Sequence, residues 1–266
     1  MTNDARSPAH PPVVLHIPHS ATSIPADVRR TLLVSDEELR RERLLVTDWY
    51  TDELFAVPSH AATTVRFPVS RLVVDPERFQ DDEREVMAER GIGVVYTRTT
   101  EGEPLREVPS PAEREELLRR FYQPHHAALA AAVEAARARH GHCLVIDCHS
   151  FPSRPLPWEL DQVPDRPDIC LGTDAFHTPA SLTDLARRLF ESAGFSVAID
   201  RPFSGALVPA AHFGREPSVR ALMIEINRRL YMDEGSGDKL SSFIAVSSTI
   251  KEVLSTLIGT AAAMQP

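Results

Sequence analysis

The chain has 266 residues, of which 42% are hydrophobic and 25% are charged, a composition typical of a soluble globular protein. Its net charge of −9 argues against a broad basic face, so we expect no nucleic-acid partner. An anionic small molecule is not excluded, because a few arginines inside a cleft can act locally.

The N-terminus and the cysteines indicate a cytoplasmic protein. Residues Met1–His10 are polar and lack the apolar core of a signal peptide. No stretch approaches the roughly 18 apolar residues of a membrane span, so we expect no membrane association. The cysteines Cys143, Cys148 and Cys170 lack CxxC spacing, which argues against a disulfide framework and against a thiolate zinc cluster.

The first half of the chain is predicted to begin with a strand at Val13–Ile17 and a helix at Ser35–Ala56. Ser35 and Glu38 form a capping-box pattern at the start of this helix. A continuous helix would place Asp48 and Asp52 on one face. Further elements are expected here: strands at Ala62–Phe67, Leu72–Val74 and Gly93–Thr97, and a charged segment with helical character at Gln80–Arg90.

The second half is predicted to begin with the longest helix, Ser110–His140, which Pro124 should break or kink. The later elements are a central strand Leu144–Asp147, a proline-rich loop Phe151–Asp168, a strand Ile169–Leu171, a helix Pro179–Ala193, strands Phe195–Ile199 and Arg220–Ile226, and a closing helix Leu240–Ala263. This alternation of strands and helices predicts an α/β fold, with a mixed central β-sheet flanked by helices in a single domain over residues 1–266.

Three apolar runs of the sequence end abruptly in polar side chains. They end at His16-Ile17-Pro18-His19-Ser20, at Asp147-Cys148-His149-Ser150 and at Glu225-Ile226-Asn227. Ligands of open α/β sheets gather where the carboxyl ends of strands stop. The sequence therefore predicts a site assembled from three distant segments.

His19 and Asp48 are candidate metal ligands from the first part of the chain. Imidazole is a common zinc ligand, although a lone histidine in a turn is more often only hydrogen-bonded there. We rank His16 below His19. Asp48 is surrounded by apolar residues, so it needs a partner such as a metal, an arginine or backbone donors, unless it is simply a surface charge.

Arg71 and Arg78 bracket the next polar segment, which contains Asp75. Arginine binds carboxylates in a bidentate manner, so either residue could hold a substrate carboxylate, with Asp75 orienting it. The alternative is an ordinary surface ion pair.

Asp147 and His149 should lie on the same side of the central strand, with Cys148 pointing the other way as a packing residue. Asp147 could then fix the tautomer of His149 or bind the metal itself. A Cys–His nucleophilic pair is disfavoured, since adjacent strand positions diverge.

Glu225 ends an apolar run and is either paired with an arginine such as Arg228 or a general base with a raised pKa. Asn227 and Arg228 follow closely and could position Glu225 or bind substrate.

Taken together, these segments resemble the N-formylglutamate amidohydrolase family. The segments that carry the resemblance occur in the expected order between residue 13 and about residue 233: His16–Ser20, Thr47–Leu54, Ser70–Asp75, Asp147–Phe151, Arg201–Gly205 and Ile224–Asp233. No single motif is specific, but the ordered set is.

The resemblance implies hydrolysis of an N-acyl amino acid, typically N-formyl-L-glutamate, late in histidine breakdown, on a zinc-exopeptidase-like fold. In the related carboxypeptidases and acylglutamate deacylases, two histidines and a carboxylate hold one zinc ion and a separate glutamate is the base. His19 and His149 look like the two histidines, and Glu225 looks like the base.

Two departures from the family pattern bear on the site. The carboxypeptidase pattern has glutamate three residues after the first histidine, where this chain has Thr22, so Asp48 is our candidate for the acidic ligand. After Asp75 the chain reads Pro-Glu-Arg where the family would have Leu-Asn-Arg, which keeps Arg78 but alters its neighbour.

We therefore expect a monomer or small homo-oligomer that binds one Zn²⁺ through His19, Asp48 and His149 and hydrolyses a small-molecule amide with Glu225 as the base. Arg71, Arg78, Asn227 and Arg228 are the expected substrate-binding residues, and Asp147 and Asp75 the supporting carboxylates. Two alternatives remain open: a deacylase of another N-acyl or N-formimino amino acid, and a metal-free protein that only binds a small carboxylate.

Overall fold

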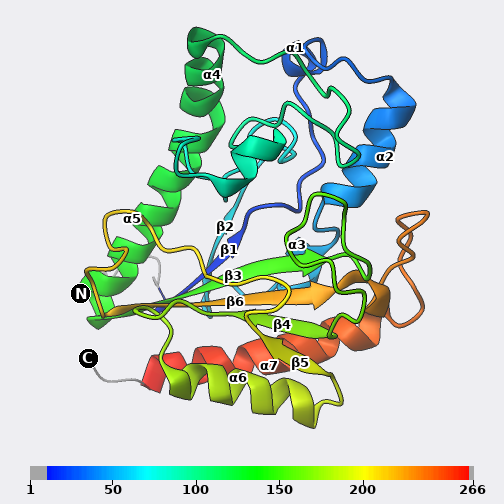
Figure 1. Ribbon diagram of the computed structural model, residues 1–266. Coiled ribbons are helices and arrows are strands. Elements are labelled where there is room, and N and C mark those ends of the chain that lie inside the picture. The colour runs from blue at the N-terminus through cyan, green and yellow to red at the C-terminus, as the bar shows by residue number, and fades with distance from the viewer. Residues whose placement is uncertain (1–10, 264–266) are drawn as a thin grey trace, which may run out of the picture.

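The computed structural model describes residues 11–263, and its centre is a six-stranded sheet (Figure 1). The strands are β1 (Val13–Ile17), β2 (Thr63–Arg66), β3 (Cys143–Phe151), β4 (Ile169–Gly172), β5 (Val197–Ile199) and β6 (Val219–Asn227), in the order β2-β1-β3-β6-β4-β5. Neighbours pair in parallel except β4, which runs antiparallel to β6. The predicted α/β fold with a mixed sheet is confirmed, while Met1–His10, where we expect no signal peptide, lies outside the described residues.

Helices cover both faces of the sheet. They are α1 (Ala26–Arg29), α2 (Asp36–Val46), α3 (Thr51–Leu54), α4 (Pro111–Leu117), α5 (Gln123–His140), α6 (Ala180–Ser192) and α7 (Phe243–Ala263), with 3-10 turns at Val86–Arg90 and Arg228–Leu230. Helices α6 and α7 pack together on one face, and α5 packs on the other (Figure 1). Burial of β1, β3 and β6 between these layers explains their near-continuous apolar sequences.

Helix α7 is long and apolar enough, by length and composition, to cross a membrane over Phe243–Ala261. However, Ile250, Leu254 and Leu257 of this helix belong to the core that covers the sheet. A core helix of a soluble protein passes the same test, so this single span is weak evidence for membrane insertion.

The helix predicted over Ser35–Ala56 is interrupted, and this correction concerns the site directly. The Ser35–Glu38 capping box forms as expected, but α2 ends at Val46 and Tyr50 adopts a left-handed φ of 64° before α3 begins. Asp48 therefore lies in the break, where its N–H donates to the carbonyl of His19. Asp52 does not share its face and instead pairs with Arg66 at 2.9 Å.

Pro124 does not end the long helix, but the regular α-helix predicted to break or kink there is interrupted just before it. A π-helical turn over Leu118–Tyr122 joins α4 to α5, so the chain stays helical from Pro111 to His140. The wider turn accommodates the proline ring, which would clash with the carbonyl four residues earlier in a regular α-helix. This turn places His125 and His126 at the start of α5.

The strands predicted at Leu72–Val74 and Gly93–Thr97 are wrong. Both segments are irregular, yet their apolar side chains are buried in two clusters beside the sheet. Short apolar runs report burial, and burial alone does not distinguish a strand from a packed loop.

Candidate active site

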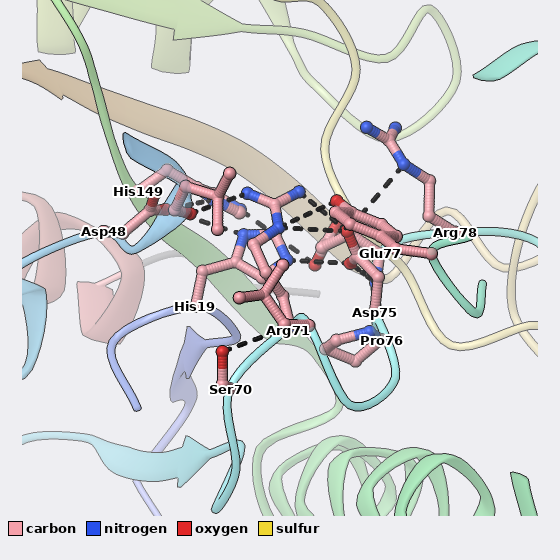
Figure 2. A network of polar contacts seen from close by, with 12 residues as sticks. His19, Asp48, Ser70, Arg71, Asp75, Pro76, Glu77, Arg78 and His149 are labelled. Atoms are coloured by element: carbon pink, nitrogen blue, oxygen red, sulfur yellow. Dashed lines mark hydrogen bonds and ion pairs between the residues drawn. The ribbon is translucent and has the colours of Figure 1, made fainter. Parts of the chain in front are cut away.

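A cavity of about 220 Å³ opens at the carboxyl ends of β1, β3 and β6. Its polar lining comes from segments far apart in the sequence: His19, Asp48, Arg71, Glu77, Arg78, His149, Ser150, Glu159, Glu225 and Arg228. Its apolar wall includes Phe151, Leu156, Trp158, Phe203 and Met223. The structure thus brings the three predicted strand-end segments together, as the close-up in Figure 2 shows for His19, Asp48 and His149.

The register of the sheet sets the spacing of the site residues. His149 on β3 lies directly opposite Glu225 on β6, and Asp147 on β3 lies directly opposite His16 on β1. Strand β3 extends to Phe151, beyond the predicted end at Asp147, so His149 is part of the sheet rather than of a following loop. Its position is therefore fixed by the pairing of β3 with β6, which continues past His149 to Phe151.

His19, Asp48 and His149 form a buried cluster whose ligand atoms lie within 4.8 Å of one another. Asp48 Oδ2 is 3.0 Å from His149 Nδ1 and 3.6 Å from His19 Nδ1. His19 Nδ1 is buried and has no hydrogen-bond partner among the described residues. An unpartnered imidazole nitrogen facing a carboxylate and a second imidazole fits the nitrogen–nitrogen–oxygen ligand set of zinc.

Two carboxylates fix the orientation of these imidazoles. His19 Nε2 is 2.8 Å from Asp75 Oδ1, and His149 Nε2 is 3.1 Å from Asp147 Oδ1. Both carboxylates are buried, but the neighbouring positive groups outweigh the burial and hold the pKa of each well below its usual range. Ionised carboxylates only accept hydrogen bonds, so both Nε2 atoms carry protons and both Nδ1 atoms face the proposed metal site.

Asp48 is held in place by Arg228. Arg228 Nη2 is 3.1 Å from Asp48 Oδ1, and the same guanidinium also donates to Leu45 O and to Ser150 Oγ. Burial tends to raise the pKa of Asp48, but His149 and His19 lower it well below its usual range. The carboxylate is therefore ionised, and Arg228 has few donors left for a substrate.

Asp75 is the centre of a buried polar network. Besides His19, it accepts hydrogen bonds from Arg71 Nη2 at 2.7 Å, from Tyr96 Oη at 2.5 Å and from the Glu77 N–H at 2.9 Å. Arg71 lines the cavity, but its guanidinium is engaged with Asp75 and Tyr96.

Arg78 is the least engaged arginine of the cavity. Its Nε is buried, has no hydrogen-bond partner in the part of the chain that the structure describes, and lies 3.8 Å from Asp75 Oδ2. Figure 2 shows the guanidinium extending away from the cluster of His19 and Asp48. Its Nη1 lies 4.0 Å from Glu85 Oε1, so the described contacts of this guanidinium are long ion pairs that leave donors for a further acceptor.

Glu225 lies beside the cluster and has the electrostatics of a proton acceptor. Burial raises its pKa to about 8, while His149 and Arg228 oppose this shift and Asp48 adds to it. Its Oε2 has no hydrogen-bond partner in the described structure. A carboxylate whose pKa lies near neutrality can both take up and release a proton at physiological pH.

Asn227 and Cys148 lie away from the cavity. The amide of Asn227 donates to Pro167 O and accepts from the Arg229 N–H, so its position gives no support to the predicted substrate contact. Cys148 packs in the core on the opposite side of β3, and burial raises the pKa of its thiol well above its usual range. A thiolate nucleophile is disfavoured there.

Sequence reasoning missed a second polar cluster, formed by His16, Glu77 and Asp147, with His125 behind it. His16 Nδ1 is 2.8 Å from Asp147 Oδ1 and 3.1 Å from Glu77 Oε1, and His16 Nε2 is 2.8 Å from His125 Nε2. Burial opposes charge on His16, but the two carboxylates raise its pKa to about 9. The sequence offers His16 and Asp147 as separate candidates, and the Pro-Glu-Arg departure is the signal that contains Glu77, but none of these indicates that the three meet.

The site combines two imidazoles and a carboxylate that can bind a metal with a second carboxylate, Glu225, whose pKa is raised. This combination at the edge of an α/β sheet is typical of hydrolytic enzymes. A family model described as N-formylglutamate amidohydrolase matches residues 11–232, and the chain belongs to this family. It is therefore an amidohydrolase that acts on a small molecule.

Similar solved structures include the following two. The N-formylglutamate amidohydrolase from Ralstonia eutropha JMP134 is 26% identical with a TM-score of 0.84, over 96% of this chain and 95% of that one. The gene product Atu2144 from Agrobacterium tumefaciens is 21% identical with a TM-score of 0.63, over 96% and 92%, and supports the fold alone. No curated protein matches the chain.

Proposed function

We propose that the chain hydrolyses the amide bond of an N-acyl amino acid, N-formyl-L-glutamate first among them, with one zinc ion held by His19, Asp48 and His149. The observation that carries this proposal is the convergence of the three ligand atoms, with Glu225 on the neighbouring strand directly opposite His149. In this role the protein would act in the cytoplasm, late in histidine breakdown.

The chain's own residues supply positioning and proton transfer. A zinc ion held by His19, Asp48 and His149 would act as a Lewis acid toward the acyl carbonyl and would lower the pKa of a water molecule to near neutrality. Glu225 takes the proton from the attacking water and returns it to the leaving amine. Asp75 and Asp147 hold the ligand imidazoles in the required tautomer, and Arg228 holds Asp48.

The direct test combines metal analysis with an activity assay. We expect the purified protein to contain zinc, to lose formate release from N-formyl-L-glutamate when a chelator removes the metal, and to regain it with zinc or cobalt. The His149→Ala variant should bind no metal at the site of His19 and Asp48. A protein without metal that still releases formate at the original rate would overturn the proposal.

Replacing Arg78 with alanine is expected to weaken substrate binding. The loss of a buried charged contact costs roughly 2–5 kcal/mol, which corresponds to a decrease in kcat/KM of about 30-fold or more. The decrease in kcat/KM should come mainly from a higher KM, measured by steady-state kinetics. Arg119, an exposed arginine on the π-helical turn, gives the matched control, and Arg119→Ala should leave KM unchanged. An unchanged KM in Arg78→Ala would assign the carboxylate to another residue.

One observation favours a second substrate class. N-formylglutamate carries two carboxylates, but Arg71 and Arg228 are engaged with Asp75 and Asp48, so Arg78 is the one less engaged arginine among the described residues of the cavity. An N-acyl amino acid with a single carboxylate and an apolar side chain would match this lining. A comparison of kcat/KM over a panel of N-formyl amino acids distinguishes N-formylglutamate from substrates with an apolar side chain.

A further inference from the structure

The cluster of His16, Glu77 and Asp147 contains an unbalanced buried oxygen. Glu77 Oε1 is buried and has no hydrogen-bond partner within residues 11–263, although His16 Nδ1 lies 3.1 Å away. The proton on His16 Nδ1 points to Asp147 Oδ1 at 2.8 Å instead. The single proton on His16 Nδ1 is used by Asp147 and leaves Glu77 Oε1 buried without a donor from the described residues, which is costly.

A metal ion in the same place would satisfy both carboxylates. The ligand atoms of His16, Glu77 and Asp147 lie within 4.8 Å of one another, as do those of His19, Asp48 and His149. One imidazole nitrogen and two carboxylate oxygens suit a divalent transition-metal ion.

The orientation of His16 matches that of the other two site histidines. His19 and His149 each use Nε2 to contact a buried side chain, Asp75 and Asp147, and present Nδ1 to the cluster. His16 likewise contacts His125 through Nε2 at 2.8 Å and presents Nδ1 to Asp147 and Glu77. A partner on the second nitrogen is the usual support of a metal-binding histidine.

The cluster of His16, Glu77 and Asp147 is also accessible to an ion and is connected to the other cluster of possible ligands. His16 and Asp147 are at most 1% exposed, whereas Glu77 is 17% exposed and lines the cavity, which gives an entry path. Asp147 Oδ1 also contacts His149 Nε2 at 3.1 Å, so one carboxylate connects the two clusters.

We propose that His16, Glu77 and Asp147 bind a second divalent metal ion beside the ion held by His19, Asp48 and His149. The second site is reached through Glu77 and shares Asp147 as its connection to the first. The proposal rests on the first metal site but not on the identity of the substrate.

The test is the stoichiometry of Zn²⁺ bound to the metal-free protein, measured by calorimetric titration and by elemental analysis after gel filtration. We expect two equivalents per chain in the wild type and one in Glu77→Gln, which keeps the shape of the side chain. Glu83→Gln, in an exposed carboxylate of the same loop, is the matched control and should keep two equivalents. Titration with Co²⁺ should show a second set of absorption bands that is lost in Glu77→Gln.

Each outcome decides between the two sites. One equivalent in the wild type means that a proton occupies the second cluster and overturns the proposal, as do two equivalents in Glu77→Gln. No bound metal at all overturns the proposed function as well. If Glu77→Gln does not fold, Glu77→Asn provides the second variant, and the wild-type stoichiometry remains decisive by itself.

Discussion

Replacing Glu225 with glutamine is expected to lower kcat by about 100-fold to 10,000-fold, the usual range for a general base. Glutamine keeps the size of the side chain but cannot take the proton of the attacking water. Because Glu225 is not one of the proposed ligands, zinc content should stay at the wild-type level, and KM should change little. Steady-state kinetics and elemental analysis of the same preparation measure both quantities.

The pH profile adds a second readout for Glu225. Burial raises the pKa of Glu225 to about 8. The positive charge of a zinc ion bound beside Glu225 would lower this pKa towards neutrality. A general base must be deprotonated. The kcat/KM of the wild type should therefore rise with pH, with a midpoint at or below about pH 8, and Glu225→Gln should lack this rise. Glu191→Gln, on the outer face of α6, is the control and should retain both the rate and the profile. A Glu225→Gln enzyme with more than a tenth of wild-type kcat contradicts the assignment.

The Asp75→Asn variant is expected to lose roughly 3–5 kcal/mol of unfolding free energy, the usual effect of breaking a buried ion pair. The substitution leaves the Arg71 charge without its counter-ion. It also replaces one of the two oxygens that accept from His19 and from Tyr96 with an amide NH2 group that cannot accept. Denaturant unfolding measures the difference. The variant should also bind zinc more weakly, because His19 loses the support of its tautomer.

The lowered pKa of Asp75 also predicts how the unfolding free energy depends on pH. Burial would raise its pKa, but Arg71 and His19 hold it well below the usual range. A carboxylate with a lowered folded-state pKa contributes stability above its unfolded pKa of about 4, and this contribution is lost as the pH falls towards the folded pKa. As the pH falls below about 4, the unfolding free energy of Asp75→Asn should therefore decrease less than that of the wild type.

The matched control for Asp75 is Asp184→Asn, which removes a carboxylate from an exposed pair with Arg187. Surface pairs contribute at most about 1 kcal/mol. An unfolding free energy of Asp75→Asn equal to that of this control would show that the buried network contributes little.

The sequence was sufficient for the strands that carry the site, because β1, β3 and β6 are apolar runs bounded by polar residues. It also placed Asp147 and His149 on one side of β3 through simple alternation. Asp48 was selected for a correct reason, its apolar surroundings, but also for a wrong one. The pattern predicts a continuous helix, and the break between Val46 and Thr51, with its left-handed Tyr50, has no signal in the sequence.

The contacts between distant segments were beyond the sequence. His16 and His125 are 109 residues apart and meet because a π-helical turn carries the chain past Pro124. Arg71 and Arg228 were expected to bind substrate, but their neutralising partners, Asp75 and Asp48, are set by packing. A cavity-facing charge can be assigned to substrate only when its internal partners are known.

The pairing of His149 with Glu225 and of Asp147 with His16 across the sheet has a consequence for engineering. Their spacing is inherited from strand register and not from loop conformation, so the loops of the cavity rim could be exchanged without moving these four side chains. A one-residue insertion in the middle of β3, by contrast, would turn His149 to the opposite face of the sheet and abolish the site while leaving every site residue in the sequence.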